Sequence, residues 1–334
     1  MVFFELRYGL RQPESMGDDM QQRYQAFIEQ CAWADKLGFT SVMISEHHGS
    51  PDGYMCSPML IGGAIAAATK RIRIRIGTIV APLHNPIRLA EDLATLDILS
   101  NGRLDPCLSA GYVGYEFEAM GTSLSNRKKY MDEIVPILHK AWTGEPFEHE
   151  GRTVRVTPRP LQRPGPRIFM GGTSKASARR AAQHADVFWP ARPELMDIYR
   201  EELSRVGRQP SMILPPKILV WLAEDPDKFW AEFGPSALHE NNAYGKWYKD
   251  WNAWNGYIVE KDVDSLRKTG RYPVVTPDEL VSQIEAQKGR DVVVTFHPLA
   301  GGAAPELAWQ SLELVESQVL PGLRKRGIET SLGC

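Results

Sequence analysis

Apolar and polar positions follow a repeating pattern along this chain, and residues 71–112 show it most clearly. Residues 72–79 alternate β-branched with polar side chains, which predicts a strand. After a polar loop, leucines at helical spacing predict a helix over 87–99, and a two-residue turn leads into a second strand over 103–109. In (β/α)₈ barrels the chemistry sits on the strand-to-helix side, and here that loop is long and polar.

The same rhythm extends over the rest of the chain. Short apolar runs predict further strands at 2–9, 40–45, 167–170, 186–189, 218–223 and 292–297. Apolar residues at helical spacing predict helices at 18–37, 126–142, 175–184, 277–287 and 305–323, with an alanine-rich helix before residue 70 and a short excursion around 147–156.

These alternations show no break in composition, so they predict the α/β class and a single (β/α)₈ TIM barrel. The alternative is a doubly wound sheet. That fold would carry a glycine-rich GxGxxG fingerprint after its first strand, and the N-terminal stretch has none.

The pattern is lost after the seventh predicted strand, between Glu224 and Arg271. Four tryptophans fall in this segment, with glycine and asparagine between them: Trp230, Trp247, Trp251 and Trp254. A connection of this length in a compact domain is usually functional. We therefore expect residues 224–271 to be an insertion in the barrel, serving as a lid over an apolar substrate or as ordinary packing and a dimer contact.

Charge and cysteine content narrow the class of protein. The net charge is −2, from 39 basic and 41 acidic residues, and no basic tract suggests nucleic acid. No apolar run approaches the roughly 20 residues that span a membrane, and the N-terminal stretch, with Glu5 and Arg7, is expected to be a strand and not a signal peptide. The four cysteines lack metal-binding spacing, which fits free thiols in a reducing cytoplasm.

The first candidate for chemistry is Glu46-His47-His48, directly after the second predicted strand. An imidazole at this edge can donate or accept a proton near neutral pH. Two histidines and a carboxylate also suggest a metal site, but neighbouring strand residues point to opposite faces, so His47 and His48 cannot easily share one ion. From the residues alone, catalytic histidines and structural or solvated ones are equally well supported.

The second candidate is Gly171-Gly172-Thr173-Ser174, between a predicted strand and helix. Backbone N–H groups at a helix N-terminus, with hydroxyls at Thr173, Ser174 and Ser177, form a natural phosphate cradle. The alternative is that Ser174 only caps the helix. Its position on the expected catalytic face favours phosphate binding.

The third candidate is the stretch 110–115, AGYVGY, after the fourth strand. Glycines beside aromatic residues suit a flat ring lying against backbone. Aromatic residues in a turn are also common in an ordinary core, and the sequence is compatible with both.

Four stretches of the chain resemble the luciferase-like flavin monooxygenases, the family of bacterial luciferase and the alkane, limonene and sulfonate monooxygenases. They are GFTSVMISEHH, RIRIRIGTIVAPLHNPIRLAEDLATLDILSNGRL, SAGYVGYEFEAMG and PRIFMGGTSKASARRAAQHAD. The likeness covers most of the chain. It implies a barrel that binds reduced FMN, or in one branch the deazaflavin F420, at the carboxyl ends of its strands.

The resemblance also implies roles for individual residues. His47 matches the active-site histidine beside the flavin, so we expect it to handle a proton during the oxygen chemistry, with no metal bound and with His48 serving structure. The matching cofactor-binding residues fall in three groups. They are Ile79, Val80 and Ala81 at the bulged end of strand three, where the family often has a non-prolyl cis peptide; Ala110, Gly111, Tyr112 and Val113 along the flavin's edge; and Gly172, Thr173, Ser174 and Ser177 at the phosphate.

One position departs from the family pattern, because bacterial luciferase has a phosphate-binding arginine where this chain has Ala110. The choice between FMN and F420 therefore stays open. We expect a cytoplasmic, homodimeric monooxygenase that takes reduced FMN from a separate reductase and uses O₂ to oxygenate a mainly apolar organic substrate. The alternatives are an F420-dependent oxidoreductase and a non-catalytic flavin-binding partner protein.

Overall fold

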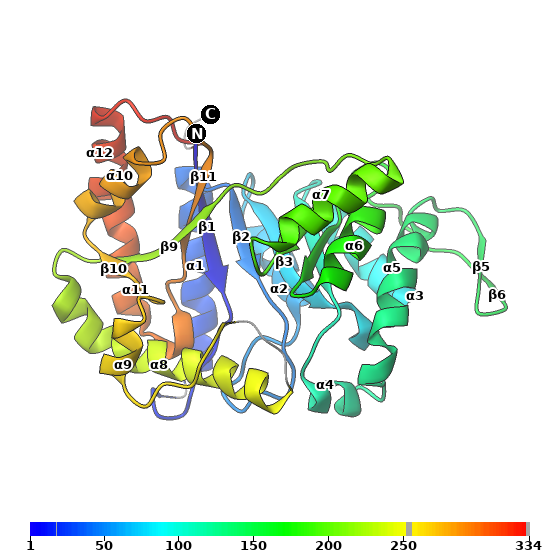
Figure 1. Cartoon of the computed structure of the whole chain (residues 1–334), viewed down its shortest axis with the longest axis horizontal. Helices are drawn as coiled ribbons and strands as arrows, with labels where there is room; N and C mark the ends of the chain where they lie inside the picture. Colours follow the sequence, from blue (N-terminus) through cyan, green and yellow to red (C-terminus); the bar gives the residue numbers. More distant parts are fainter. Residues whose placement is uncertain (18, 252–255, 332–334) are drawn as a thin grey trace.

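The computed structural model describes residues 1–17, 19–251 and 256–331, so Trp254 and Cys334 lie outside the described residues. The expected α/β class is confirmed, with helices packed around a nine-stranded sheet (Figure 1). In chain order the strands of this sheet are β1 (Val2–Tyr8), β2 (Ser41–Ile44), β3 (Arg73–Val80), β4 (Leu104–Ser109), β7 (Phe169–Gly172), β8 (Val187–Pro190), β9 (Lys217–Leu222), β10 (Val274–Val275) and β11 (Val292–Phe296).

The strand order is that of a (β/α)₈ barrel with an opening between β8 and β9. Neighbours are hydrogen-bonded in the order β9-β11-β1-β2-β3-β4-β7-β8, every pair is parallel, and the short β10 pairs with β9. No ladder joins β8 to β9 within the described ranges. The Nζ atom of Lys217 on β9 instead lies 4.1 Å from the ring centroid of Trp189 on β8. The strand order of the predicted barrel is therefore confirmed. Between β8 and β9, where hydrogen bonds would close the barrel, the contact is instead made by the side chains of Trp189 and Lys217.

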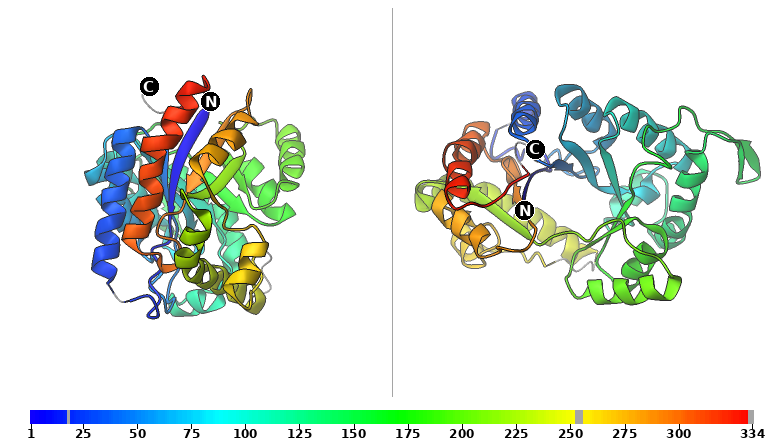
Figure 2. Two further views of the ribbon diagram at one scale, coloured as in Figure 1. Left: turned by 90° about the vertical axis from the view of Figure 1, so that its left-hand side faces the viewer. Right: turned by 90° about the horizontal axis from the view of Figure 1, so that it is seen from above.

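Helices flank the strands, as the two views of Figure 2 show. The longer ones are α1 (Met20–Leu37), α2 (Pro58–Ala68), α3 (Pro86–Leu99), α5 (Arg127–Ala141), α6 (Lys175–His184), α7 (Leu195–Val206), α8 (Pro226–Asp250), α10 (Pro277–Glu285) and α11 (Pro305–Leu314). The shorter elements are α4 (Gly114–Ala119), α9 (Val263–Lys268), α12 (Leu320–Lys325) and the β5–β6 hairpin (Phe147–His149, Arg152–Val154). Among the described residues, no helix is both long enough and apolar enough to cross a membrane.

Local signals explain where several elements begin and end. The Asn85 side chain accepts hydrogen bonds from the N–H groups of the first turn of α3, and Pro86 occupies its first position. Helix α1 ends at Gly38, whose φ of 90° suits glycine. Asn101 and Gly102 both have positive φ, as a tight turn of this kind requires.

Most of the segment 224–271, where the repeating pattern is lost in the sequence, is the 25-residue helix α8 followed by α9. Gly234, Pro235 and Gly245 lower its helix propensity, and its apolar residues do not form one stripe. The reason is that α8 is buried on more than one side. Its first half packs on β9 and its second half covers the end of β2.

The first half of α8 belongs to a second apolar cluster. Its members include Trp221, Phe229, Trp230, Phe233, Leu266, Tyr272 and Leu307. Trp221 lies on β9 and Leu307 on α11, so this cluster is built partly from barrel elements and is not an independent core. In Figure 1, α8 and α4 lie beneath the carboxyl ends of the strands.

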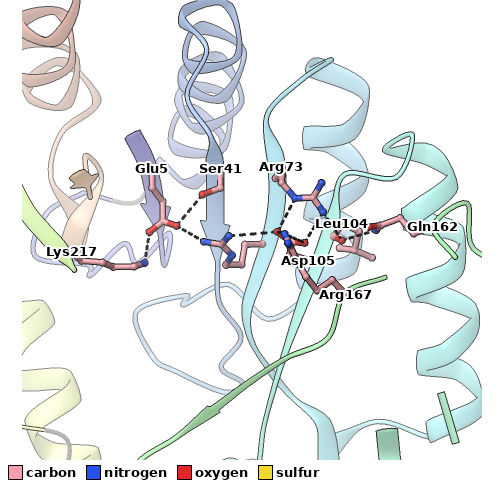
Figure 3. A network of polar contacts seen from close by, with 9 residues as sticks. Glu5, Ser41, Arg73, Leu104, Asp105, Gln162, Arg167 and Lys217 are labelled. Carbon is pink, nitrogen blue, oxygen red and sulfur yellow. Dashed lines mark hydrogen bonds and ion pairs between the residues drawn. The ribbon is translucent and has the colours of Figure 1, made fainter. Parts of the chain in front are cut away.

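Charged side chains fill the barrel interior near the amino ends of the strands (Figure 3). Glu5 on β1 accepts hydrogen bonds from Ser41, Arg75, Lys217 and Thr295. Asp105 on β4 pairs with Arg73, Arg75 and Arg167. Because Glu5 and Asp105 are almost fully buried, these ion pairs replace the water that such charges need.

Candidate active site

The residues singled out from the sequence lie at the carboxyl ends of β2, β3, β4 and β7. Of these, His47 makes the most specific contact, because its Nδ1 atom lies 2.8 Å from Oε1 of Glu116 on α4. Both side chains are buried. The same carboxylate oxygen accepts a hydrogen bond of 3.0 Å from the backbone N–H of His48, which fixes α4 against the end of β2.

The environment of His47 favours a neutral imidazole. Burial lowers the pKa of His47 below its usual value, although the Glu116 carboxylate acts to raise it. With a carboxylate opposite Nδ1, the favoured tautomer carries its proton there and leaves the Nε2 lone pair available. This arrangement suits a group that accepts a proton and passes it on.

His48 belongs to a separate hydrogen-bonded set centred on Glu46. The Glu46 Oε1 atom lies 2.9 Å from Nε2 of His48 and 2.8 Å from Nε2 of His84, and Oε2 accepts from the N–H of Val80. Burial acts to lower the pKa of His48, but the hydrogen bond to Glu46 outweighs it and raises this pKa. Among the described residues, no group of three or more His, Cys, Asp or Glu side chains is arranged to hold a metal ion.

Aromatic side chains surround the His47 ring. The centroid distances to its ring are 4.3 Å for Trp247, 4.8 Å for Tyr54, 5.8 Å for Tyr112 and 6.2 Å for Tyr244. Trp247 and Tyr244 come from α8. Helix α8 therefore places aromatic side chains over His47.

Arg11 and Asp52 connect this cover to the barrel rim. The Arg11 guanidinium lies over the rings of Tyr54, Tyr244 and Trp247, at 4.5, 4.8 and 4.7 Å from their centroids. It also pairs with Asp52, whose carboxylate lies 2.7 Å from Nε2 of His239 on α8. These contacts hold α8 against the loop that follows β2.

The third strand is distorted near its end. The Gly77–Thr78 peptide is cis, and the register of β3 against β4 shifts between Gly77 and Ile79. Thr78 Oγ1 donates to Ser109 Oγ at 2.9 Å. The side chains of the predicted residues Ile79, Val80 and Ala81 are buried, whereas Gly77 and Thr78, just before them, retain accessible surface.

The predicted stretch 110–113 packs against this distorted strand. Gly111 has a φ of +67°, and a Cβ there would lie 2.5 Å from Cγ1 of Val80, so the close approach requires glycine. The Tyr112 ring stacks on Tyr248 of α8 at 4.8 Å, while Val113 is buried and Ala110 stays partly exposed. The predicted residues of β3 and β4 are thus brought together.

The predicted phosphate cradle forms the N-terminus of α6. Ser174 caps the helix and exchanges hydrogen bonds with Ser177 in a capping box. A Cβ on Gly172 would lie 2.1 Å from Ser177 Oγ, so only glycine fits here. Thr173 and Ser174 are exposed. The capping alternative is therefore realised, while Thr173 and Ser174 remain exposed residues of the loop.

Arg192, which the sequence reasoning did not single out, lies beside this loop. It follows β8, and its Nη2 atom donates to the carbonyl oxygen of Thr173 at 2.8 Å. A guanidinium is thus placed next to the candidate phosphate site although position 110 is alanine. Glu116, Arg11 and Arg192 were all missed because their partners are distant in sequence, and no spacing rule joins them.

Comparisons with known proteins agree on one family. The sequence profile of the luciferase-like monooxygenases matches residues 7–286. The chain is 33% identical over 180 residues to the oxygenase component of flavin-dependent trigonelline monooxygenase from Acinetobacter baylyi, a match covering 51% of this chain and 50% of that protein. It is 23% identical over 340 residues to limonene 1,2-monooxygenase from Rhodococcus erythropolis, covering 89% and 82%. The chain thus spans about half the length of the first of these relatives.

Solved structures show the same fold. Monooxygenase RslO1 from Streptomyces bottropensis superposes with a TM-score of 0.74 at 26% identity, covering 96% of this chain and 99% of that one. The oxygenating constituent of 3,6-diketocamphane monooxygenase from Pseudomonas putida, a complex with FMN, gives a TM-score of 0.72 at 21% identity and the same coverage.

Proposed function

The chain belongs to the luciferase-like monooxygenase family, and from this we propose that it is the oxygenase of a two-component flavin system. Its co-substrates are reduced FMN, delivered by a separate reductase, and O₂. One oxygen atom enters an organic substrate with a largely apolar body and the other leaves as water. The relative from Acinetobacter baylyi is itself named as an oxygenase component, which supports a separate reductase.

The observation that carries this proposal is the His47–Glu116 pair beneath an aromatic cover. Bound reduced flavin supplies the two electrons that O₂ requires. The chain itself supplies the His47 imidazole. Its Nδ1 atom is held by Glu116, so its Nε2 atom is free to accept a proton and release it again. Trp247 and Tyr244 act as a lid that excludes water, which is the role we propose for the insertion 224–271.

The chain's own residues fit a flavin phosphate at the β7–α6 loop. Gly172 lets the loop pack closely against Ser177 at the start of α6, and the positive end of the α6 dipole favours an anion there. The exposed Thr173 and Ser174 hydroxyls and the Arg192 guanidinium complete the cradle. At the other end, Gly77, Thr78 and Ala110 keep accessible surface where a flat ring can lie against backbone.

Replacing Arg192 by leucine is expected to weaken FMN binding by about 10- to 100-fold, since a charged hydrogen bond contributes about 1.5–3 kcal/mol. Riboflavin lacks the phosphate, so its affinity should stay unchanged. Fluorescence titration with both flavins measures the difference. Arg200→Leu, on an exposed arginine of α7, is the matched control. Equal weakening of FMN and riboflavin would place Arg192 outside the phosphate site.

The oxygenase proposal itself is tested by isotope incorporation. Purified protein, a flavin reductase and FMN are supplied with ¹⁸O₂ and a panel of terpenoid, aldehyde and polycyclic substrates. We expect one labelled oxygen atom per product molecule, whether the reaction is hydroxylation, epoxidation, Baeyer–Villiger insertion or N-oxidation. Products labelled only from water would contradict the proposal.

We also propose that the protein is a homodimer, supported by an exposed apolar face on α2. The helix carries no charged side chain, and its outward residues include Leu60, which is 75% exposed, and Ala64. Leu99 of the neighbouring α3 is also exposed. Apolar faces of this kind usually mark a contact with another protein surface.

Leu60→Glu should therefore shift the protein from dimer toward monomer in light scattering, because the substitution places two charges in an apolar interface. Leu161→Glu changes a leucine that is also exposed, and it should leave the mass unchanged. A wild-type mass equal to the 37.5 kDa of a single chain would contradict the dimer.

A further inference from the structure

Arg7 lies on β1, two residues after Glu5, which belongs to the network of charges in Figure 3. Along β1, alternate residues share a face, so Arg7 points to the same side as Glu5, which bonds within the barrel. Its neighbour in the register is Met43 of β2, and Met43 in turn lies against Gly77 of the distorted strand. Arg7 therefore lies inside the barrel, closer than Glu5 to the carboxyl ends of the strands.

The guanidinium of Arg7 makes no hydrogen bond and no ion pair with any residue in the described ranges, and the residue as a whole is only partly buried. This distinguishes it from Arg11, which pairs with Asp52, and from Arg75, which pairs with Glu5 and Asp105. An arginine side chain stays protonated in proteins. A charge inside a barrel without a partner is unfavourable, so such a residue indicates a binding role.

The groups around Arg7 are aromatic rings and one acidic side chain. Burial acts to lower the pKa of Arg7, but Tyr257, Tyr244, Glu240 and Tyr54 outweigh it and raise this pKa well above the usual value. The carboxylate of Glu240 is already engaged, because Oε2 accepts from the N–H of Gly301.

His297, which follows β11 next to β1, has one ring nitrogen without a hydrogen-bond partner among the described residues. Its Nδ1 atom lies 3.5 Å from Oε1 of Glu240, and its buried Nε2 atom has no hydrogen-bond partner among the described residues. The Arg7 guanidinium on β1 and the His297 Nε2 atom just after β11 therefore both lack hydrogen-bond partners among the described residues.

This end of the site lies away from the candidate phosphate loop. In the sheet order β1-β2-β3-β4-β7, three strands separate Arg7 from the loop after β7 that carries Gly172 and Thr173. Arg192 already stands beside that loop. Arg7 is thus placed for a different anionic group, on the side of the barrel that also holds His47.

We propose that Arg7 recognises the carboxylate of the substrate, and that the substrates are organic carboxylates. This inference rests on the proposed function and names its substrate class. The planar guanidinium matches a carboxylate with two parallel hydrogen bonds. The expectation of a mainly apolar substrate is thereby refined, since one end of the molecule carries a negative charge.

Calorimetric titration of the protein with 1-naphthoate and its neutral isostere 1-naphthamide tests the proposal. We expect wild-type protein to bind naphthoate at least tenfold more tightly than naphthamide. Arg7→Met should abolish this preference and Arg7→Lys should keep part of it, because lysine retains the charge without the planar fork. Arg88→Met, on an exposed arginine of α3, should leave the preference unchanged.

Two results would overturn the proposal. One is equal affinity of wild-type protein for naphthoate and naphthamide. The other is an Arg7→Met variant that keeps the preference, and a loss of reduced-FMN affinity in that variant would then assign Arg7 to the flavin. The proposed function fails separately, because wild-type protein that prefers naphthoate but binds no reduced FMN would refute the oxygenase and leave the role of Arg7 standing.

Discussion

His47→Ala is expected to lower turnover by about 10²–10⁴, the usual cost of removing a general acid or base, while reduced-FMN binding is retained. The reason is that the imidazole is held by Glu116 at the end of β2 and does not form part of the phosphate cradle. Without it, O₂ still consumes reduced flavin, but the oxygen leaves mainly as hydrogen peroxide. Steady-state turnover and peroxide release, measured on the same samples, check this expectation.

Two further variants distinguish the catalytic role proposed for His47 from the structural roles of its neighbours. His48→Ala removes a histidine that bonds to Glu46, so it should lower thermal stability and leave most coupling intact. Glu116→Gln keeps the shape but removes the charge opposite Nδ1. As a positioning change, it should shift the pH profile of turnover as well as its size. Equal and small coupling losses in the His47 and His48 variants would refute this division of roles, and activity sensitive to chelators would support the metal alternative.

Arg75→Met is expected to lower the free energy of unfolding by about 3–5 kcal/mol, the usual cost of removing one partner of a buried ion pair. Arg75 pairs with both buried acidic residues of the network in Figure 3. Its Nη1 atom lies 2.8 Å from Glu5 Oε2, and its Nη2 atom lies 3.5 Å from Asp105 Oδ2. Urea unfolding measures the change. Arg88→Met removes an exposed pair with Asp92 and should cost less than about 1 kcal/mol.

The same network predicts how stability depends on pH. Burial acts to raise the pKa of Glu5, but Lys217 and Arg75 outweigh it and lower this pKa below the usual 4.5. The pKa of Asp105 is likewise lowered below 3.8, where burial is opposed chiefly by Arg73. The unfolded chain therefore binds more protons, so this stability is present above about pH 4.5 and is lost as pH falls through the folded-state values.

Melting temperatures measured from pH 6 downward should thus fall below about pH 4.5 in wild-type protein. The fall should be shallower in Arg75→Met, which has already lost part of the charge pairing. A wild-type melting temperature that stays constant through this range would show that Glu5 and Asp105 have ordinary pKa values.

The fold was largely predictable because its signals are local. The alternation of residues 72–79 and the caps at Asn85 and Gly38 are properties of short segments. Helix α8 was not predictable in this way, because its apolar residues contact β9 with one half and His47 with the other, and no single stripe results. The opening between β8 and β9 was also missed, since pairing at that point depends on how distant strands meet.

In the candidate site, too, the residues with local signals were predictable and those with distant partners were not. His47 and the Gly172–Ser177 loop follow directly on predicted strands, so their position was evident from the sequence. Glu116 was overlooked because 69 positions separate it from His47. Arg7 was counted only as evidence against a signal peptide, since a strand pattern does not say whether a charged side chain inside a barrel has a partner.

Anaerobic titration of the wild-type protein with reduced FMN, alongside reduced F420, tests the central claim most directly. The family, the phosphate cradle at Gly172 and the His47–Glu116 pair together predict saturable binding of reduced FMN at one site per chain. Saturable binding of F420 alone would make the protein a deazaflavin-dependent oxidoreductase. Binding of neither would contradict the account and favour a non-catalytic partner protein.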